Sequence, residues 1–178
     1  MPGRFVDPDL VTTHFHIKPG ESVADLGAGV GYFIPALARA VGVEGTVFAC
    51  EIQRELVEKL GNIASEPEWG TVVPVWGDLE TLSGTKLPDL GIDVAVIVNT
   101  LFLLEDKEVA GQEIVRILRP GGRLYVIDWT ESEGGLGPAP GMVVNEAAAT
   151  ALFETNGFVL ERTFPAGDHH YGLAFRNS

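Results

Sequence analysis

Short apolar runs rich in β-branched residues recur along the chain, and segments with apolar residues at helical spacing separate most of them. The first runs are almost continuously apolar, which is typical of strands that helices cover on both faces. The pattern predicts seven strands, at Ser22–Leu26, Thr46–Cys50, Val72–Trp76, Asp93–Val98, Leu124–Asp128, Phe158–Phe164 and Tyr171–Phe175.

Start and stop signals bound the helical segments. Asp7 before Pro8 is an N-cap followed by proline at the first helical position, and Asn145 can cap the last helix. The sequence Arg-Pro-Gly-Gly at 119–122 is a stop signal. The predicted helices are Pro8–Phe15, Phe33–Val41, Arg54–Ala64, Asp106–Leu118 and Glu146–Thr155, and we expect a loop over Leu79–Ile92.

Alternating strands and helices predict an α/β fold, a three-layer sandwich around a mostly parallel sheet. The last two strands are joined by about six residues, too few for a crossover, so they must form an antiparallel hairpin. The last strand therefore runs against the others. We expect one domain over residues 1–178, with residues 1–20 as a short N-terminal cap segment.

Charge and composition narrow the function. With 25 acidic and 12 basic side chains the formal charge is −13, which repels phosphate backbones and disfavours a nucleic-acid partner. No apolar run approaches the roughly 20 residues of a membrane span, and residues 1–8 carry no signal pattern, so we expect a cytoplasmic protein. Cys50 is the only cysteine, which excludes an intrachain disulfide and a thiolate metal cluster.

A glycine-rich turn follows the first predicted strand, within Val23–Phe33. Its glycines are Gly27, Gly29 and Gly31, so their spacing is G-x-G-x-G. The dinucleotide-binding fingerprint is G-x-G-x-x-G, and its third glycine would fall on Tyr32. The spacing therefore argues against a nicotinamide or flavin dinucleotide.

Acidic residues near this turn indicate which ligand fits. Asp25 faces the turn, where it would repel a pyrophosphate and attract a ligand carrying an amine and a sulfonium. Glu51, after the second strand, offers two acceptor oxygens to the two hydroxyls of a ribose. Asp78, after the third strand, can accept from the exocyclic amine of adenine, with Leu79 and Ile52 covering the ring.

Five motifs occur in order: V-A-D-L-G-A-G-V-G-Y-F, V-F-A-C-E-I, V-W-G-D-L-E, D-V-A-V-I-V-N-T and L-R-P-G-G-R-L-Y-V-I-D-W. Through them nearly the whole chain resembles class I S-adenosylmethionine-dependent methyltransferases, and by analogy their small-molecule and quinone-type branch. The resemblance implies a Rossmann-like fold with strand order 3-2-1-4-5-7-6 and S-adenosyl-L-methionine as cofactor. It implies cofactor contacts from Asp25, Gly27, Ala28, Gly29, Gly31, Glu51, Ile52, Asp78, Leu79 and Asn99, the last beside the sulfonium.

The methyl acceptor is expected beyond the carboxyl ends of the strands. The turn of the terminal hairpin lies on this edge, so His169 and His170, with Asp128 after the fifth strand, are candidates for binding the acceptor or removing its proton. The alternative for this turn is a polar, solvated connection. Candidate substrate-binding residues at the same edge are Tyr32, Thr100, Trp129 and Tyr171.

Several segments could cover this site: Met1–His16, Leu79–Ile92, Glu131–Gly141, or a second subunit of a homodimer. The loop at Ser132–Gly141 has the length of a lid, although a plain surface connection fits it equally. We expect no metal site, because the adjacent His169 and His170 rarely point at one ion and nothing brings His14 and His16 to them.

Other functions stay open at this point. The same residues would serve a protein that binds S-adenosylmethionine or its demethylated product, S-adenosylhomocysteine, without catalysis. A methyltransferase acting on a protein or on ribosomal RNA would share the motifs, though the acidic charge weighs against RNA. A nicotinamide-dependent oxidoreductase is disfavoured by the glycine spacing and by Asp25.

Overall fold

Seven strands form one sheet in the order β3-β2-β1-β4-β5-β7-β6. The computed structural model describes residues 6–132 and 137–178. All neighbours pair in parallel except β7, which is antiparallel to both β5 and β6. Both the predicted order and the antiparallel last strand are confirmed. The strands are β1 (Ser22–Leu26), β2 (Thr46–Glu51), β3 (Val72–Trp76), β4 (Ile92–Val98), β5 (Leu118–Trp129), β6 (Phe158–Pro165) and β7 (His170–Asn177).

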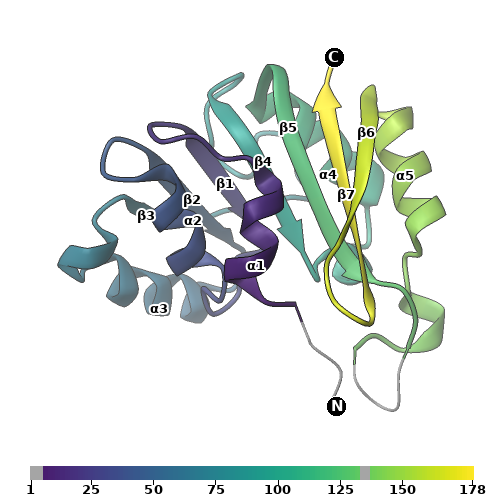
Figure 1. Cartoon of the computed structure of the whole chain (residues 1–178), viewed down its shortest axis with the longest axis horizontal. Coiled ribbons are helices and arrows are strands. Elements are labelled where there is room, and N and C mark those ends of the chain that lie inside the picture. Colours follow the sequence, from purple (N-terminus) through teal and green to yellow (C-terminus); the bar gives the residue numbers. More distant parts are fainter. Residues whose placement is uncertain (1–5, 133–136) are drawn as a thin grey trace.

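The helices cover both faces of the sheet (Figure 1). The α-helices are α1 (Pro8–Thr12), α2 (Ile34–Val41), α3 (Arg54–Ala64), α4 (Lys107–Ile117) and α5 (Glu146–Thr155). Both predicted caps are present, since Asp7 accepts from Asp9 N at 3.1 Å and Asn145 accepts from Ala148 N at 2.9 Å. Short 3-10 turns, which the sequence pattern did not predict, occur at η1 (Thr13–Phe15), η2 (Pro67–Trp69), η3 (Leu101–Leu103) and η4 (Pro140–Met142).

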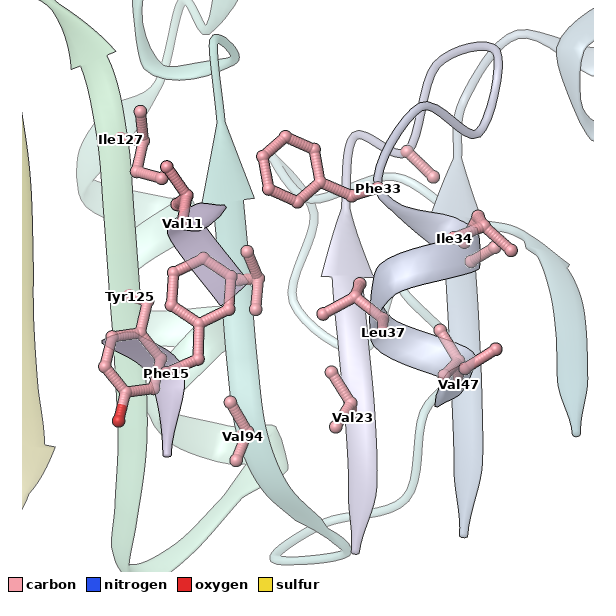
Figure 2. Packing of buried hydrophobic residues seen from close by; sticks show 14 of the residues in the cluster. Val11, Phe15, Val23, Phe33, Ile34, Leu37, Val47, Val94, Tyr125 and Ile127 are labelled. Carbon is pink, nitrogen blue, oxygen red and sulfur yellow. The ribbon is translucent and has the colours of Figure 1, made fainter. Parts of the chain in front are cut away.

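Two separate apolar cores hold the layers together. On one face Phe15 stacks on Tyr125 of β5, with ring centroids 4.7 Å apart, and α2 contributes Leu37 over β1 (Figure 2). On the other face α4 and α5 contribute Ile114 and Phe153. Side chains of successive strand residues point to opposite faces, so the continuously apolar strands supply both cores.

The boundaries of β5 differ from the prediction. The strand begins at Leu118 instead of Leu124, because Leu118 pairs with Ile92 at the start of β4 before the register shifts between Ile92 and Val94. The Arg-Pro-Gly-Gly signal does end the preceding helix, at Ile117. Gly121 in this stretch has φ +72°, a conformation that glycine adopts without strain.

The strand order reverses between β1 and β4, since β1 leads to β2 on one side and β4 to β5 on the other. In open α/β sheets a crevice forms at such a switch point, outside the carboxyl ends of the strands. The turn between β6 and β7 lies at this same edge, at the bottom of the view in Figure 1. The fold therefore brings the glycine turn, the ends of β4 and β5 and the terminal hairpin together.

Candidate active site

A cavity of about 590 Å³ occupies the crevice at the carboxyl ends of β1, β2 and β4. This volume lies in the usual range for small-molecule and cofactor sites. Nine of the ten predicted cofactor residues line it: Asp25, Gly27, Ala28, Gly29, Glu51, Ile52, Asp78, Leu79 and Asn99. Gly31 is the exception. A Cβ at Gly31 would meet side chains of α3 and not the cavity, with Leu60 at 3.0 Å and Ile63 at 3.2 Å. Its place in the turn reflects close packing on α3.

The glycine turn is held by the strand beside it. The N–H groups of Gly27 and Ala28 both donate to the carbonyl of Cys50, at 2.9 and 3.0 Å. Gly27 has φ +80°, and a Cβ on it would lie 2.6 Å from the hydroxyl of Thr100. Gly29 has φ +56°, but a Cβ there would meet nothing within 4 Å and would stand in open space. The first glycine is thus required by packing, and the second leaves room in the cavity.

Asp25 is a buried carboxylate that faces the cavity without a partner. It is 3% exposed, and it makes no hydrogen bond or ion pair with any residue in the described part of the chain. Burial, and after it the charge of Glu51, raises the pKa of Asp25 to about 7. Burying a charge without a partner is costly, so this site fits a ligand that brings a positive charge. The amine and sulfonium of S-adenosylmethionine meet that requirement.

Glu51, the last residue of β2, joins the glycine turn to the start of α3. Its Oε2 accepts from Gly29 N at 3.0 Å, and its Oε1 accepts from Ile52 N and Gln53 N, both at 2.9 Å. A carboxylate has about four lone-pair sites, so these three bonds leave acceptor capacity toward the cavity. The backbone bonds also fix the direction in which the carboxylate points.

Asp78 and Leu79 follow β3 on the opposite side of the cavity from Asn99. Asp78 Oδ1 accepts from Glu80 N at 2.9 Å, and its Oδ2 accepts from the Thr81 hydroxyl at 2.7 Å. These bonds close a tight turn and leave one acceptor position on each oxygen. Leu79 and Ile52 also line the cavity, and a planar heterocycle could lie between their side chains, next to Asp78.

His170 and Trp129 form the part of the cavity that faces the terminal hairpin. The His170 ring lies 4.3 Å from the Trp129 ring, is 6% exposed, and finds no hydrogen-bond partner for either nitrogen among the described residues. Burial, and then the neighbouring His169, lowers the pKa of His170 to about 4, so the imidazole is neutral near pH 7. A neutral imidazole can accept a proton or a hydrogen bond from a ligand.

Asn99 is a further group in the cavity with an unpartnered atom. Its Oδ1 is buried and has no hydrogen-bond partner within residues 6–132 and 137–178. Its φ is +53°, in the left-handed region, which asparagine adopts more readily than most residues other than glycine. The unpartnered Oδ1 therefore marks Asn99 as a candidate ligand contact more strongly than its backbone does.

Three of the predicted catalytic and substrate-binding residues do not line the cavity. Asp128 accepts from Leu101 N at 2.9 Å and Trp129 N at 2.8 Å, and burial raises its pKa to about 6. Tyr171 donates its hydroxyl to the Val144 carbonyl at 2.8 Å. The Nδ1 of His169 lies 3.8 Å from the Glu131 carboxylate.

The two remaining substrate candidates, Tyr32 and Thr100, do line the cavity. Tyr32 is 63% exposed at its mouth, with its hydroxyl 3.5 Å from the Val6 carbonyl. Sequence reasoning missed the apolar residues Val6, Phe33, Leu103 and Leu104 that also line the cavity. The run Leu-Phe-Leu-Leu at 101–104, directly after a strand end, was the signal for two of them.

Two absences apply to the described residues alone. No cluster of three or more His, Cys, Asp or Glu side chains in residues 6–132 and 137–178 is arranged to hold a metal ion. Within those same ranges, no helix combines the length and apolar character that crossing a membrane requires. Two of the segments predicted to cover the site, Met1–His16 and Glu131–Gly141, lie partly outside the described residues, at positions 1–5 and 133–136.

A doubly covered α/β sheet with a cavity at its switch point is the arrangement in which many α/β proteins bind nucleotide-type cofactors. Comparison with known proteins specifies it further. A family model described as a methyltransferase domain matches residues 24–126. The chain therefore belongs to the methyltransferase-domain family, and the resemblance to class I S-adenosylmethionine-dependent methyltransferases is confirmed.

Individual relatives agree with this assignment. The chain is 30% identical over 122 residues to the ubiquinone/menaquinone biosynthesis C-methyltransferase UbiE of Teredinibacter turnerae, covering 67% of this chain and 47% of the relative. The chain spans about half the length of the curated relatives it matches.

Among solved structures, a SAM dependent methyltransferase from Aquifex aeolicus superposes with a TM-score of 0.89 at 26% identity, covering 98% of this chain and 91% of that one. A putative type 11 methyltransferase from Sulfolobus solfataricus, 22% identical, shares the fold with a TM-score of 0.77, covering 98% and 95% of the two chains.

Proposed function

We propose that this protein transfers a methyl group from S-adenosylmethionine to a small-molecule acceptor. The observation that carries the proposal is Asp25, a buried and unpartnered carboxylate beside the glycine turn, in a cavity of cofactor size. A pyrophosphate would be repelled there, whereas a ligand with an amine and a sulfonium relieves the cost of the buried charge. Family membership supports the same cofactor.

The chain's residues have separate roles toward the cofactor in this proposal. Asp25 and the turn at Gly27–Gly29 hold the methionine end, Glu51 accepts from the ribose hydroxyls, and Asp78 with Leu79 holds the adenine. When bound, the cofactor supplies a methyl group that its sulfonium already activates. The protein has to position the acceptor in line and exclude water, so no catalytic triad is required.

His170 and Asn99 make up the acceptor side of the cavity in this proposal. Both carry buried polar atoms without partners among the described residues, and both are next to apolar walls from Trp129 and Leu103. An acceptor that is mostly apolar and carries one hydrogen-bonding group fits these walls. His170, neutral near pH 7, can accept a hydrogen bond from such a group, although its pKa of about 4 makes it a weak base for proton removal.

Asp128 and Tyr171 act behind the cavity, since their hydrogen bonds go to the protein, and His169 does not line the cavity either. Asp128 secures the start of the η3 turn through Leu101, and Tyr171 secures the segment at Val144. His169 lies near Glu131. We therefore assign them positioning roles, and we assign Tyr32 with Val6 to the mouth of the cavity.

A small-molecule acceptor is supported by the relative from Teredinibacter turnerae, whose name states a role in ubiquinone and menaquinone biosynthesis. The net charge of −13 adds weight against a nucleic-acid acceptor.

Calorimetric titration tests the cofactor. The protein is titrated separately with S-adenosylmethionine, S-adenosylhomocysteine and a nicotinamide dinucleotide. We expect the first two to bind and the third not to bind. Binding of the dinucleotide alone would overturn the proposal.

Turnover separates an enzyme from a protein that only binds the cofactor. Formation of S-adenosylhomocysteine is followed by mass spectrometry with pools of small aromatic and aliphatic alcohols, phenols and amines. The His170→Phe variant is run beside the wild type, because its cavity keeps an aromatic ring but loses both nitrogens. Acceptor-dependent product in the wild type, reduced in the variant, is the expected result.

A further inference from the structure

The segment between β3 and β4 forms one wall of the cavity, and its backbone contains several strained φ angles. Gly77, Asp78, Leu79 and Glu80 line the cavity at its beginning. Further along, three residues other than glycine have positive φ angles: Ser83 at 61°, Lys86 at 60° and Leu90 at 52°. L-residues rarely adopt this conformation, so the segment needs outside contacts that hold it.

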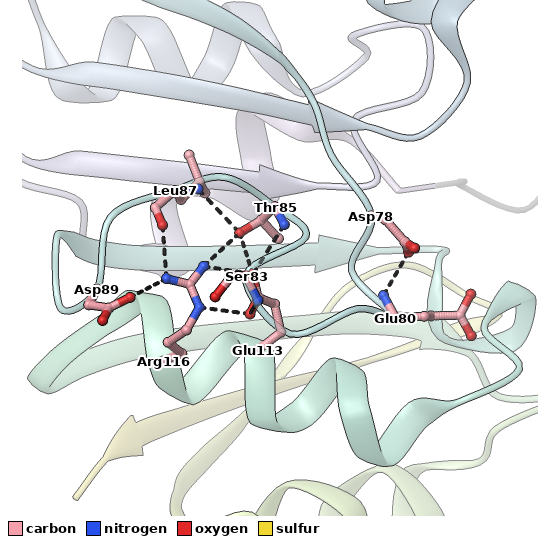
Figure 3. Close-up of polar contacts among 8 residues, drawn as sticks. All are labelled: Asp78, Glu80, Ser83, Thr85, Leu87, Asp89, Glu113 and Arg116. Atoms are coloured by element: carbon pink, nitrogen blue, oxygen red, sulfur yellow. Dashed lines mark hydrogen bonds and ion pairs between the residues drawn. The ribbon is translucent and has the colours of Figure 1, made fainter.

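Glu113, on the inner face of α4, supplies those contacts (Figure 3). Its side chain is 0% exposed. Its Oε2 accepts from Ser83 N at 2.8 Å, and its Oε1 accepts from Thr85 N at 3.1 Å and from the Thr85 hydroxyl at 2.6 Å. One carboxylate from a distant helix therefore bonds both ends of the turn at 83–85.

Arg116, one turn further along α4, completes the anchor. Its guanidinium donates to both oxygens of Glu113, at 2.8 and 2.7 Å, and to the Leu87 carbonyl at 3.0 Å. It also pairs with Asp89. Burial opposes ionisation of Glu113, but the bonds from Arg116, Thr85 and Ser83 outweigh it and lower the pKa of Glu113. The carboxylate is thus charged, bonded on both oxygens and fixed in position.

The turn that Glu113 holds is in direct contact with the cavity wall. The Gly84 carbonyl accepts from Asp78 N at 3.0 Å. A Cβ on Gly84 would lie 2.4 Å from the Asp78 carbonyl, and a Cβ on Gly77 would lie 2.9 Å from the Thr85 Cα. Packing this close leaves no slack, so a shift of the turn moves Asp78 and Gly77 with it.

We propose that Glu113, which does not line the cavity, is a positioning residue that sets the affinity for the adenine end of the cofactor through the turn at 83–85. The proposal rests on the proposed function. An ion pair buried on the back of the sheet would have only a stabilising role if the turn were free to move independently of Asp78. The close contacts at Gly84 and Gly77 link the turn at 83–85 to Asp78 and the cavity wall.

The test is Glu113→Gln, which keeps the side-chain shape but turns one acceptor oxygen into a donor facing backbone N–H groups. We expect the dissociation constant for S-adenosylhomocysteine to rise roughly 3- to 30-fold, the range for residues that act through intervening contacts. Adenosine alone should lose affinity by a similar factor. The calorimetric stoichiometry should stay at the wild-type value, which a partly unfolded sample would lower.

Glu21→Gln is the matched control. Glu21 is also buried and bonded to an arginine, accepting from Arg123 at 2.5 Å and from Lys18 N at 2.8 Å, but it precedes β1 at the opposite edge of the sheet. We expect this variant to lower the melting temperature and leave the dissociation constant unchanged. Equal loss of affinity in both variants would overturn the proposal, because a general loosening would explain it.

Variants of Thr85 cover the case in which Glu113→Gln does not fold. Thr85→Val removes the hydroxyl that donates to Glu113, and Thr85→Ser retains it. Lower affinity in Thr85→Val, with recovery in Thr85→Ser, supports the proposal, and wild-type affinity in Thr85→Val overturns it. If the wild type itself fails to bind S-adenosylhomocysteine, the proposed function fails first and the two results are distinguishable.

Discussion

Replacing Gly27 by alanine should damage the fold at one defined contact. Gly27 has φ +80°, and the new Cβ would lie 2.6 Å from Thr100 Oγ1 and 2.8 Å from Thr100 Cγ2. Left-handed backbone costs an alanine about 1–2 kcal/mol, partly offset by about 0.4–1 kcal/mol of lost entropy in the unfolded chain. The steric overlap adds about 1–3 kcal/mol. We expect the free energy of unfolding to fall by about 2–4 kcal/mol.

Gly29→Ala is the matched comparison, because it carries the same kind of backbone strain without the overlap. Gly29 has φ +56°, and its Cβ would meet nothing within 4 Å. We expect a loss of about 1 kcal/mol in unfolding free energy. The methyl group would stand in the cavity, so this variant should lose affinity for S-adenosylhomocysteine while staying nearly as stable as the wild type.

Urea unfolding followed by circular dichroism measures both losses, with a common slope for all variants. Thr100→Ala removes the two nearest atoms, so combined with Gly27→Ala it should recover at least about 1 kcal/mol relative to the sum of the single changes. Recovery will be partial, since Thr100 Cβ would still be 3.2 Å away. Equal losses for Gly27→Ala and Gly29→Ala, or full additivity in the double variant, would refute the reasoning.

Three further predictions concern the cavity. The folded pKa of Asp25 lies near 7, above the ordinary 3.8, so its contribution to stability is present below pH 4 and is lost as pH rises to 7. Urea unfolding at pH 8 should therefore show Asp25→Asn to be more stable, by at most about 4 kcal/mol, while calorimetry shows weaker cofactor binding. Glu51→Ala should weaken S-adenosylmethionine binding by about 1–3 kcal/mol, and unchanged calorimetric affinity would contradict the ribose assignment. His170→Phe keeps the ring on Trp129 and removes two unpartnered nitrogens, so thermal unfolding should show about 1–2 kcal/mol more stability. A loss of stability would mean that the nitrogens are bonded.

Local patterns in the sequence predicted the α/β class, most of the strands and helices and the antiparallel last strand, whereas the strand order came from the family resemblance. The strands are nearly continuous apolar runs, and Asp7 and Asn145 are helix caps that act within one turn of the chain. The six residues before Tyr171 excluded a crossover and determined the direction of β7. These signals involve residues close together in the chain, so they can be recognised without knowledge of the tertiary fold. The start of β5 was missed because its pairing with Ile92 depends on a strand from elsewhere.

The cofactor was also predicted from the sequence, through a family resemblance and because Asp25, Glu51 and Asp78 lie at or near the carboxyl ends of three strands that must meet at one edge of a parallel sheet. The roles of the histidines in the terminal hairpin could not be predicted from the sequence. His169 and His170 are adjacent, but His169 lies in the turn and His170 is the first residue of β7, paired with Trp129 of β5, so only the tertiary structure decides which one reaches the cavity.

Gly31 and Glu113 also differ between what the sequence indicates and what the tertiary packing shows. Gly31 belongs to the glycine pattern, yet its φ of +87° and the close side chains of Leu60 and Ile63 account for it without a ligand contact. Glu113 reads in the sequence as a charged residue on a helix, yet its carboxylate is buried and bonded to a turn about 30 residues away. Sequence patterns predicted most of the helices and strands and the direction of the last strand, and the motifs implied the strand order and the cofactor through a family resemblance. The tertiary structure decided which polar atoms are left without partners, because that depends on contacts between residues far apart in the chain.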